Sequence, residues 1–138
     1  MLRKTISGAG ATALLTTALL VGFPTAEAAP TYHPWGTTNA KDQVLQRGCH
    51  VYTYRYSITA PTDRWAAEIF IVNPNGRTLA SNTLDTASDP DRGSARVTLC
   101  RPSTVLGVHK IKMKITWQRG REIYDGFVKP STFRLTRR

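Results

Sequence analysis

Three lysines alternate with apolar residues late in the chain, and their spacing could support binding of an anionic ligand. Lys110, Lys112 and Lys114 belong to the segment 110–117, which has a bulky apolar residue at every second position. A β-strand rises about 3.3 Å per residue and points successive side chains to opposite faces, so neighbouring ammonium groups would lie about 6.6 Å apart on one face. Such a row attracts anionic polymers through long-range electrostatics and counterion release.

Further cations extend this candidate site. Arg134 would join the same face if the last strand pairs with the lysine strand, and Arg119 and Arg121 would lie at its rim. The alternative is that the lysines only solubilise an exposed face and oppose edge-to-edge aggregation. The predicted anion-binding residues are therefore Lys110, Lys112, Lys114, Arg119, Arg121 and Arg134.

The net charge of the chain is concentrated around this row. The 138 residues include 19 Lys and Arg against 9 Asp and Glu, a formal net charge of +10. Residues 93–138 hold eleven basic and two acidic residues, whereas residues 29–92 hold six of each. The length excludes a large multidomain protein, and the charge balance excludes an acidic tail protein.

The two cysteines, Cys49 and Cys100, predict one disulfide if the protein is exported. The alternatives are a catalytic thiol and a zinc site, but neither cysteine has histidines at metal-ligand spacing. Both cysteines are out of phase with the bulky residues of their segments. This parity predicts a peripheral link between strand ends instead of a bond through the centre of the core.

Other reactive side chains form no recognisable motif. Asp85, Asp89 and Asp91 lie close together, but the twelve-residue calcium loop with its distal glutamate is absent. The three histidines are far apart, and the H-E-x-x-H, G-x-S-x-G and phosphate-loop patterns are missing. We expect no catalytic residues, no metal and no cofactor, although a Ser/His/Asp site assembled in space leaves no sequence signature.

Two aromatic segments, 32–35 and 124–127, offer a second candidate binding surface. Their rings could stack against a ligand beside nearby arginines. The alternative is that the first segment covers an open end of the fold, with Trp35 as a plug.

Strand patterns dominate the chain after residue 48. Alternating segments occur at 50–58, 65–72, 95–99, 110–117 and 132–136, and turn residues occupy 73–76 and 118–121. Tyr52, Tyr54 and Tyr56 share one face, which we assign to the core; if exposed, they would form a ladder able to stack on sugar rings. No segment after residue 28 shows a helical period. The expected fold is all-β, a single antiparallel β-sandwich with one disulfide.

The N-terminus predicts secretion. Arg3 and Lys4 precede a charge-free run over 5–26, and Ala26-Glu27-Ala28 predicts cleavage after Ala28. The alternative is a retained membrane anchor. We divide the chain into a signal peptide (1–28), an irregular lead-in arm (29–48) and the β-sandwich domain (49–138). The released domain is expected to be an extracellular monomer without stable membrane insertion.

The segments 97–100, 105–117 and 130–135 resemble the late strands of small bacterial secreted domains of immunoglobulin-like or fibronectin type III-like type. In those domains a Gly-x-Tyr-x-hydrophobic strand is followed by a hairpin and a terminal Ser/Thr-x-Phe-x-hydrophobic strand; here His109 occupies the tyrosine position. The resemblance implies an immunoglobulin-like architecture. Adhesins, binding modules, inhibitors and spacers all share that architecture, so it implies no single activity.

These observations favour a secreted, non-catalytic binding module that contacts anionic polymers of the cell envelope, or an extracellular protein, through the lysine face. We expect no specific recognition of nucleic acid. The second hypothesis is a protease inhibitor that presents the segment 101–104 beside the disulfide. The third is a small enzyme whose site forms only in three dimensions.

Overall fold

A computed structural model describes residues 28–138, which form β-strands, one 3-10 turn and no α-helix. The strands are β1 (Gly36–Asn39), β2 (Gln43–Val44), β3 (Cys49–Ile58), β4 (Trp65–Val72), β5 (Thr78–Asp85), β6 (Arg92–Cys100), β7 (Gly107–Arg119), β8 (Glu122–Phe127) and β9 (Ser131–Thr136). The 3-10 turn η1 (Arg101–Ser103) connects β6 to β7. This part of the chain contains no helix long and apolar enough to cross a membrane. The predicted signal peptide lies, except for Ala28, outside the described residues.

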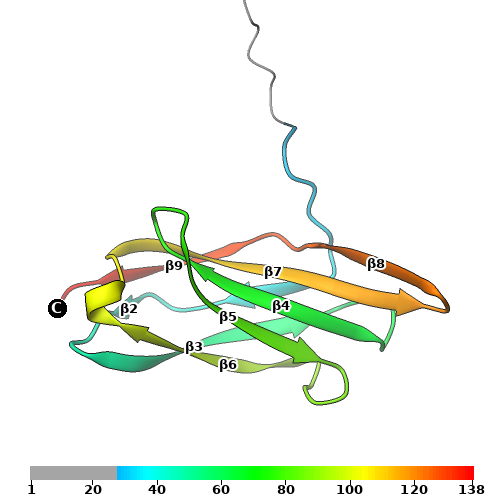
Figure 1. The fold of residues 1–138 in the computed structure, drawn as a ribbon, viewed down its shortest axis with the longest axis horizontal. Coiled ribbons are helices and arrows are strands. Elements are labelled where there is room, and N and C mark those ends of the chain that lie inside the picture. Colours follow the sequence, from blue (N-terminus) through cyan, green and yellow to red (C-terminus); the bar gives the residue numbers. More distant parts are fainter. Residues whose placement is uncertain (1–27) are drawn as a thin grey trace, which may run out of the picture.

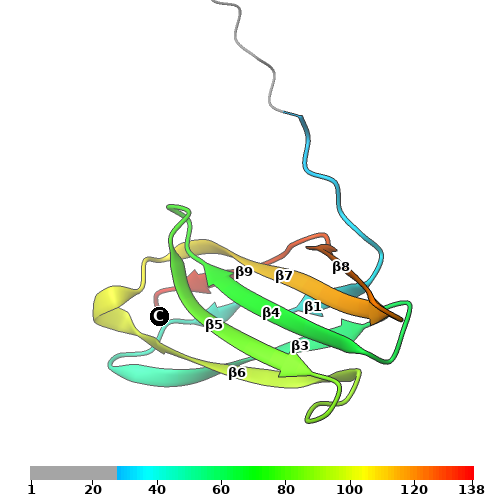
Figure 2. The ribbon, with the colours of Figure 1, turned by 45° about the vertical axis from the view of Figure 1, so that its right-hand side comes forward.

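The strands form two sheets that face each other (Figure 1). The smaller sheet has the order β1-β3-β6, and the larger has the order β2-β9-β7-β4-β5 with β8 paired to β7. Figure 2 shows β4, β5 and β7 of the larger sheet in front of β3 and β6. The all-β prediction is confirmed. The larger sheet is mixed, however, because β2 runs parallel to β9 while all other paired strands are antiparallel.

The core lies between the two sheets and follows the predicted alternation. Tyr52, Tyr54 and Tyr56 of β3 are buried, so the exposed tyrosine ladder is excluded. From the larger sheet, Ile111 and Met113 of β7 have no exposed surface. Burying one face of each strand is the main apolar contribution to stability, and it leaves the other face of β7 free to present its lysines.

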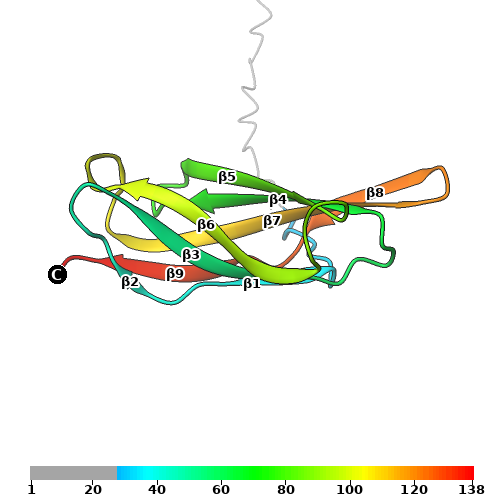
Figure 3. The same cartoon turned by 90° about the horizontal axis from the view of Figure 1, so that it is seen from below.

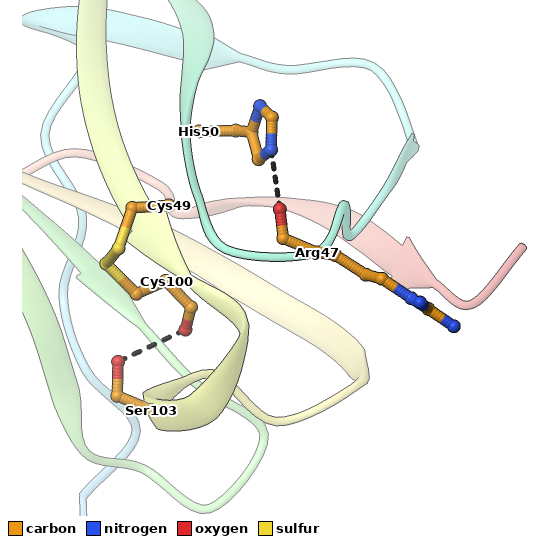
Figure 4. The surroundings of a disulfide bond; sticks show 5 residues. All are labelled: Arg47, Cys49, His50, Cys100 and Ser103. Atoms are coloured by element: carbon orange, nitrogen blue, oxygen red, sulfur yellow. Dashed lines mark hydrogen bonds between the residues drawn. A yellow bond between two sulfur atoms is a disulfide. The ribbon is translucent and has the colours of Figure 1, made fainter.

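The disulfide forms as predicted and lies at the edge of the fold (Figure 4). Cys49 and Cys100 are directly opposite each other at the ends of β3 and β6, two neighbouring strands of the smaller sheet. The bond therefore joins strands within one sheet and does not cross the core. A backbone hydrogen bond from Arg101 N to Gly48 O, 2.9 Å, closes the same end.

The lead-in arm is more ordered than its composition indicated, because it contains β1 and β2. β1 pairs with the far end of β3, from Gly36 opposite Ile58 to Asn39 opposite Arg55. Gly36 approaches Ser57 so closely that a β-carbon would overlap the Ser57 carbonyl oxygen. Strands of four and two residues are too short for an alternating pattern to be recognised in the sequence.

Strand β7 is long enough to pair with two strands along one edge. Its first half pairs with β9 and its second half with β8, while β4 pairs along the opposite edge. Figure 3 shows the β7-β8 hairpin extending beyond the rest of the molecule. The hairpin turn contains Gly120 at φ 61°, a backbone conformation that side chains disfavour. The turn was predicted, whereas β8 itself was not, because its apolar residues Ile123, Tyr124 and Phe127 do not alternate with polar ones.

Candidate anion-binding surface

The lysine row lies on the outer face of the larger sheet, as the alternation predicted. Lys110, Lys112 and Lys114 project from β7 away from the core, while the residues between them are fully buried. Arg134 of β9 is opposite Val108 and therefore shares this outer face. The pairing of β7 with β9 thus brings four of the predicted cations together.

Lys114 differs from its neighbours because it has an acidic partner. Its Nζ lies 2.7 Å from Asp125 Oδ2 of β8, and Glu68 of β4 is directly opposite it. The hydrogen bond to Asp125, together with that carboxylate's charge, raises the pKa of Lys114 above its ordinary value. Lys114 therefore stays protonated, but its charge is compensated within the protein.

Lys112 lies between two aromatic side chains. Its Nζ is 5.3 Å from the centroid of the Phe127 ring, within the range of a cation–π interaction. On the other side, Phe70 of β4 is directly opposite Lys112. Phe127 is 37% exposed, so this lysine presents charge and apolar surface together.

Among residues 28–138, the side-chain cations of Lys110 and Arg134 form no ion pair with a carboxylate. The register neighbours of Lys110 are Val72 and Thr132. Asp42 accepts a hydrogen bond from the Arg134 backbone N–H at 2.7 Å and forms no ion pair with its guanidinium. Within residues 28–138, Lys114–Asp125 is the one ion pair closer than 4 Å. We call the uncompensated set Lys110, Lys112 and Arg134 the basic strand face.

Arg119 does not belong to this face. It has the same parity as the buried residues of β7, and its guanidinium carbon lies 5.3 Å from the Trp117 ring on the opposite side of the sheet. Arg121 is exposed in the hairpin turn, beyond the end of β7. The parity of residue 119 could have shown this from the sequence, because the strand continues without interruption through Trp117.

The two aromatic segments come together around Trp117. Trp35 contacts it edge-on at 5.6 Å and Tyr124 stacks on it at 4.2 Å, while His33 stacks on Trp35 at 4.0 Å. Trp117 is only 7% exposed and Trp35 is half-buried. Hydrogen bonds from His33 N to Phe127 O and from Thr59 N to Trp35 O hold the arm in place. This packing favours the plug interpretation over a ligand platform.

The histidines lie in three separate environments. His33 stacks on Trp35, His50 contacts the Arg47 carbonyl at 2.6 Å, and His109 is completely buried. In the described part of the chain, none of them hydrogen-bonds to a carboxylate. The arrangement contains no nucleophile–base–acid relay of the kind that hydrolases use.

The aspartates of the segment 85–91 organise a turn. Asp85 accepts hydrogen bonds from the backbone amides of Ala87 and Ser88, and Asp89 accepts one from the Asp85 amide. Asp91 accepts a hydrogen bond from Trp65 Nε1 at 3.0 Å. No group of three or more metal-ligating side chains occurs among residues 28–138.

The segment considered for protease inhibition is compact. Arg101–Ser103 forms the 3-10 turn η1, in which Ser103 Oγ donates to the Cys100 carbonyl at 3.1 Å (Figure 4). Arg101 is half-buried. The segment is therefore a tight turn and not an extended loop, and it exposes Pro102 and Ser103.

Comparisons with known proteins identify no relative of this chain. No protein-family model matches it, and neither the curated proteins nor the solved structures include a significant match. The site is accordingly interpreted from its own residues.

The partners of the lysines are the part of the site that sequence reasoning missed. Glu68 and Phe70 on β4, and Asp125 and Phe127 on β8, are positioned beside the row only by strand register. The alternating Glu68 and Phe70 were visible in the sequence, but which strand would pair with which lysine was not.

Proposed function

We propose that this protein is a secreted, non-catalytic binding module that contacts anionic polymers through the basic strand face. The observation that carries the proposal is the distribution of partners on one sheet face: Lys114 is neutralised by Asp125, whereas no carboxylate among residues 28–138 lies within 4 Å of the side-chain cations of Lys110, Lys112 and Arg134. When exposed, uncompensated cations of a protein bind a polyanion, the small counterions condensed on the polyanion are released. This release favours association.

The aromatic neighbours of Lys112 favour an anionic polysaccharide as the polymer. Phe70 and Phe127 border the lysine and give the face apolar area between its charges. Sugar rings present apolar C–H faces that pack on aromatic rings, while their carboxylate or sulfate groups pair with ammonium and guanidinium groups.

The proposed extracellular location is supported by the Cys49–Cys100 disulfide, because such bonds persist mainly in oxidising compartments.

The proposed immunoglobulin-like architecture is supported by the sheet order β9-β7-β4-β5 facing β1-β3-β6, which matches the G-F-C-C′ and A-B-E order of such domains. The disulfide within one sheet departs from the antibody pattern, where the bond crosses between sheets.

The test is retention on immobilised dextran sulfate and polygalacturonate, with uncharged dextran as the control matrix. We expect retention on both anionic matrices in low salt and elution as the salt concentration rises. Equal retention on uncharged dextran, or no retention on either anionic matrix in low salt, would contradict the proposal.

A further inference from the structure

A cavity at the disulfide end of the fold is lined by arginines. Its volume is about 770 Å³, within the range of small-molecule binding sites. Four arginines and one histidine line it, namely Arg47, Arg101, Arg137, Arg138 and His50, together with Val44, Leu45 and Gln46. We call this the arginine pocket. No carboxylate side chain lines it.

The arginines of the pocket come from three separate segments of the chain. Arg47 precedes β3, Arg101 begins η1, and Arg137 and Arg138 follow β9. Figure 1 shows that η1, β2 and the end of the chain meet at one end of the molecule. The fold thus gathers like charges that are remote in sequence, and none of these guanidiniums has a carboxylate within 4 Å among residues 28–138.

The backbone around the pocket is held by cross-links that do not use the guanidinium groups. The disulfide and the bond from Arg101 N to Gly48 O tie Arg101 to the turn that carries Arg47. His50 Nε2 contacts the Arg47 carbonyl, and Figure 4 shows the Arg47 side chain extending away from the disulfide. Leu45 N donates to Thr136 O at 2.9 Å, which fixes the segment leading to Arg137. All four side chains therefore remain available to a ligand on a pre-organised frame.

We infer that the arginine pocket binds a small polyanion that carries several phosphate or sulfate groups. Guanidinium groups form paired hydrogen bonds with tetrahedral oxyanions, and several of them around one concavity raise the local concentration of anions. The cavity is far larger than one oxyanion, and its arginines come from three separate segments of the chain, so the pocket fits a multivalent ligand. This inference goes beyond the proposed function, because none of these residues belongs to the basic strand face.

The test is titration calorimetry of the full disulfide-bonded domain, residues 29–138, with tripolyphosphate and with sucrose octasulfate. We expect one saturable site for at least one of these probes, and the tighter probe assigns phosphate or sulfate as the preferred group. The Arg47→Gln/Arg101→Gln variant keeps the backbone cross-links and should bind at least tenfold more weakly. The control variants are Lys110→Glu/Lys112→Glu and Arg55→Glu/Arg96→Glu, which change the net charge of the protein equally. Their affinities for the probe should differ from each other less than twofold.

The outcomes separate this inference from the proposed function. Loss of probe binding in the arginine variant, with unchanged retention on polygalacturonate, which carries no sulfate or phosphate group, supports a distinct pocket. Arg101→Lys keeps the positive charge but replaces the planar guanidinium with an ammonium group. A loss of probe affinity in this variant smaller than that in Arg47→Gln/Arg101→Gln also supports a distinct pocket. No saturable binding of either probe to the unmodified domain, or equal losses in all three double variants, would overturn the inference.

Discussion

Lys114 Nζ and Asp125 Oδ2 lie 2.7 Å apart across the β7-β8 pair, so one member of the lysine row is neutralised while its neighbours are free. The lysines of the row therefore differ in how much of their positive charge is available to a ligand. This means that the sum of positive charge on β7 overestimates the charge available to a ligand.

Replacing Asp125 should strengthen binding to an anionic polymer. Asp125→Asn frees Lys114, and we expect affinity for dextran sulfate in low salt to increase about two- to fivefold, the range of one exposed ion pair. Salt-dependent binding measurements check this. The matched control is Asp63→Asn, which removes the same charge from an exposed aspartate of the loop before β4 that forms no ion pair with the lysine row among residues 28–138, and an equal gain in that variant would contradict a local effect.

Removing the disulfide should lower stability without changing the fold. The bond links residues separated by 51 positions, and the loop entropy of that closure is about 4 kcal/mol, with measured values for such bonds usually about 2–4 kcal/mol. Urea unfolding of a Cys49→Ser/Cys100→Ser variant measures the loss. A difference below about 0.5 kcal/mol would show that the strand pairing alone fixes this end of the smaller sheet.

Acidification should destabilise the protein through His109. The imidazole is fully buried, its Nδ1 contacts the Gly107 carbonyl at 3.1 Å, and its Nε2 has no hydrogen-bond partner among residues 28–138. Burial lowers the pKa of His109 below its ordinary value of 6.5. The unfolded chain therefore binds more protons than the folded protein once the pH falls below about 6.5, and stability decreases with a slope of at most about 1.4 kcal/mol per pH unit.

The measurement for His109 is the urea midpoint between pH 7.5 and pH 5, above the range where carboxylates dominate. His109→Phe preserves an aromatic ring against Phe133 and should flatten the pH dependence in this interval. Identical slopes in the two proteins would exclude His109 as the source.

Disturbing the aromatic plug should cost stability and leave polymer binding intact. Gly126 lies so close to His33 that a β-carbon would overlap the imidazole ring, and it also approaches Trp35. We expect Gly126→Ala to destabilise the protein by about 1–3 kcal/mol, as overpacking does in well-packed sites. Thermal unfolding with a parallel dextran sulfate assay checks both parts, and lost polymer binding in a stable Gly126→Ala variant would favour the ligand-platform interpretation.

The sequence was most informative where side chains alternate over a long strand. The periods of 50–58 and 110–117 predicted which side chains enter the core, and the parity of Cys49 and Cys100 predicted a peripheral bond. These features depend on local geometry alone, since every second residue of a strand faces the same side.

Features that depend on which segments become neighbours could not be predicted. The pairing of Lys114 with Asp125 requires β8, whose apolar residues do not alternate with polar ones and therefore give little strand signal. The arginine pocket forms because the start of β3 and the ends of β6 and β9 lie close together. The residues around Arg47 and Arg101 in the sequence do not predict this proximity. Both follow from tertiary pairing.

The central claim is that the basic strand face is the polymer-binding surface, and the most direct test compares two charge-matched variants. Lys110→Glu/Lys112→Glu changes this face, whereas Arg55→Glu/Arg96→Glu makes the same change in net charge on the outer face of the smaller sheet. We predict that only the first variant loses affinity for dextran sulfate, by at least tenfold at low ionic strength, with a shallower dependence of log affinity on log salt concentration. Equal losses in the two variants would contradict the claim, because binding would then follow net charge and not this surface.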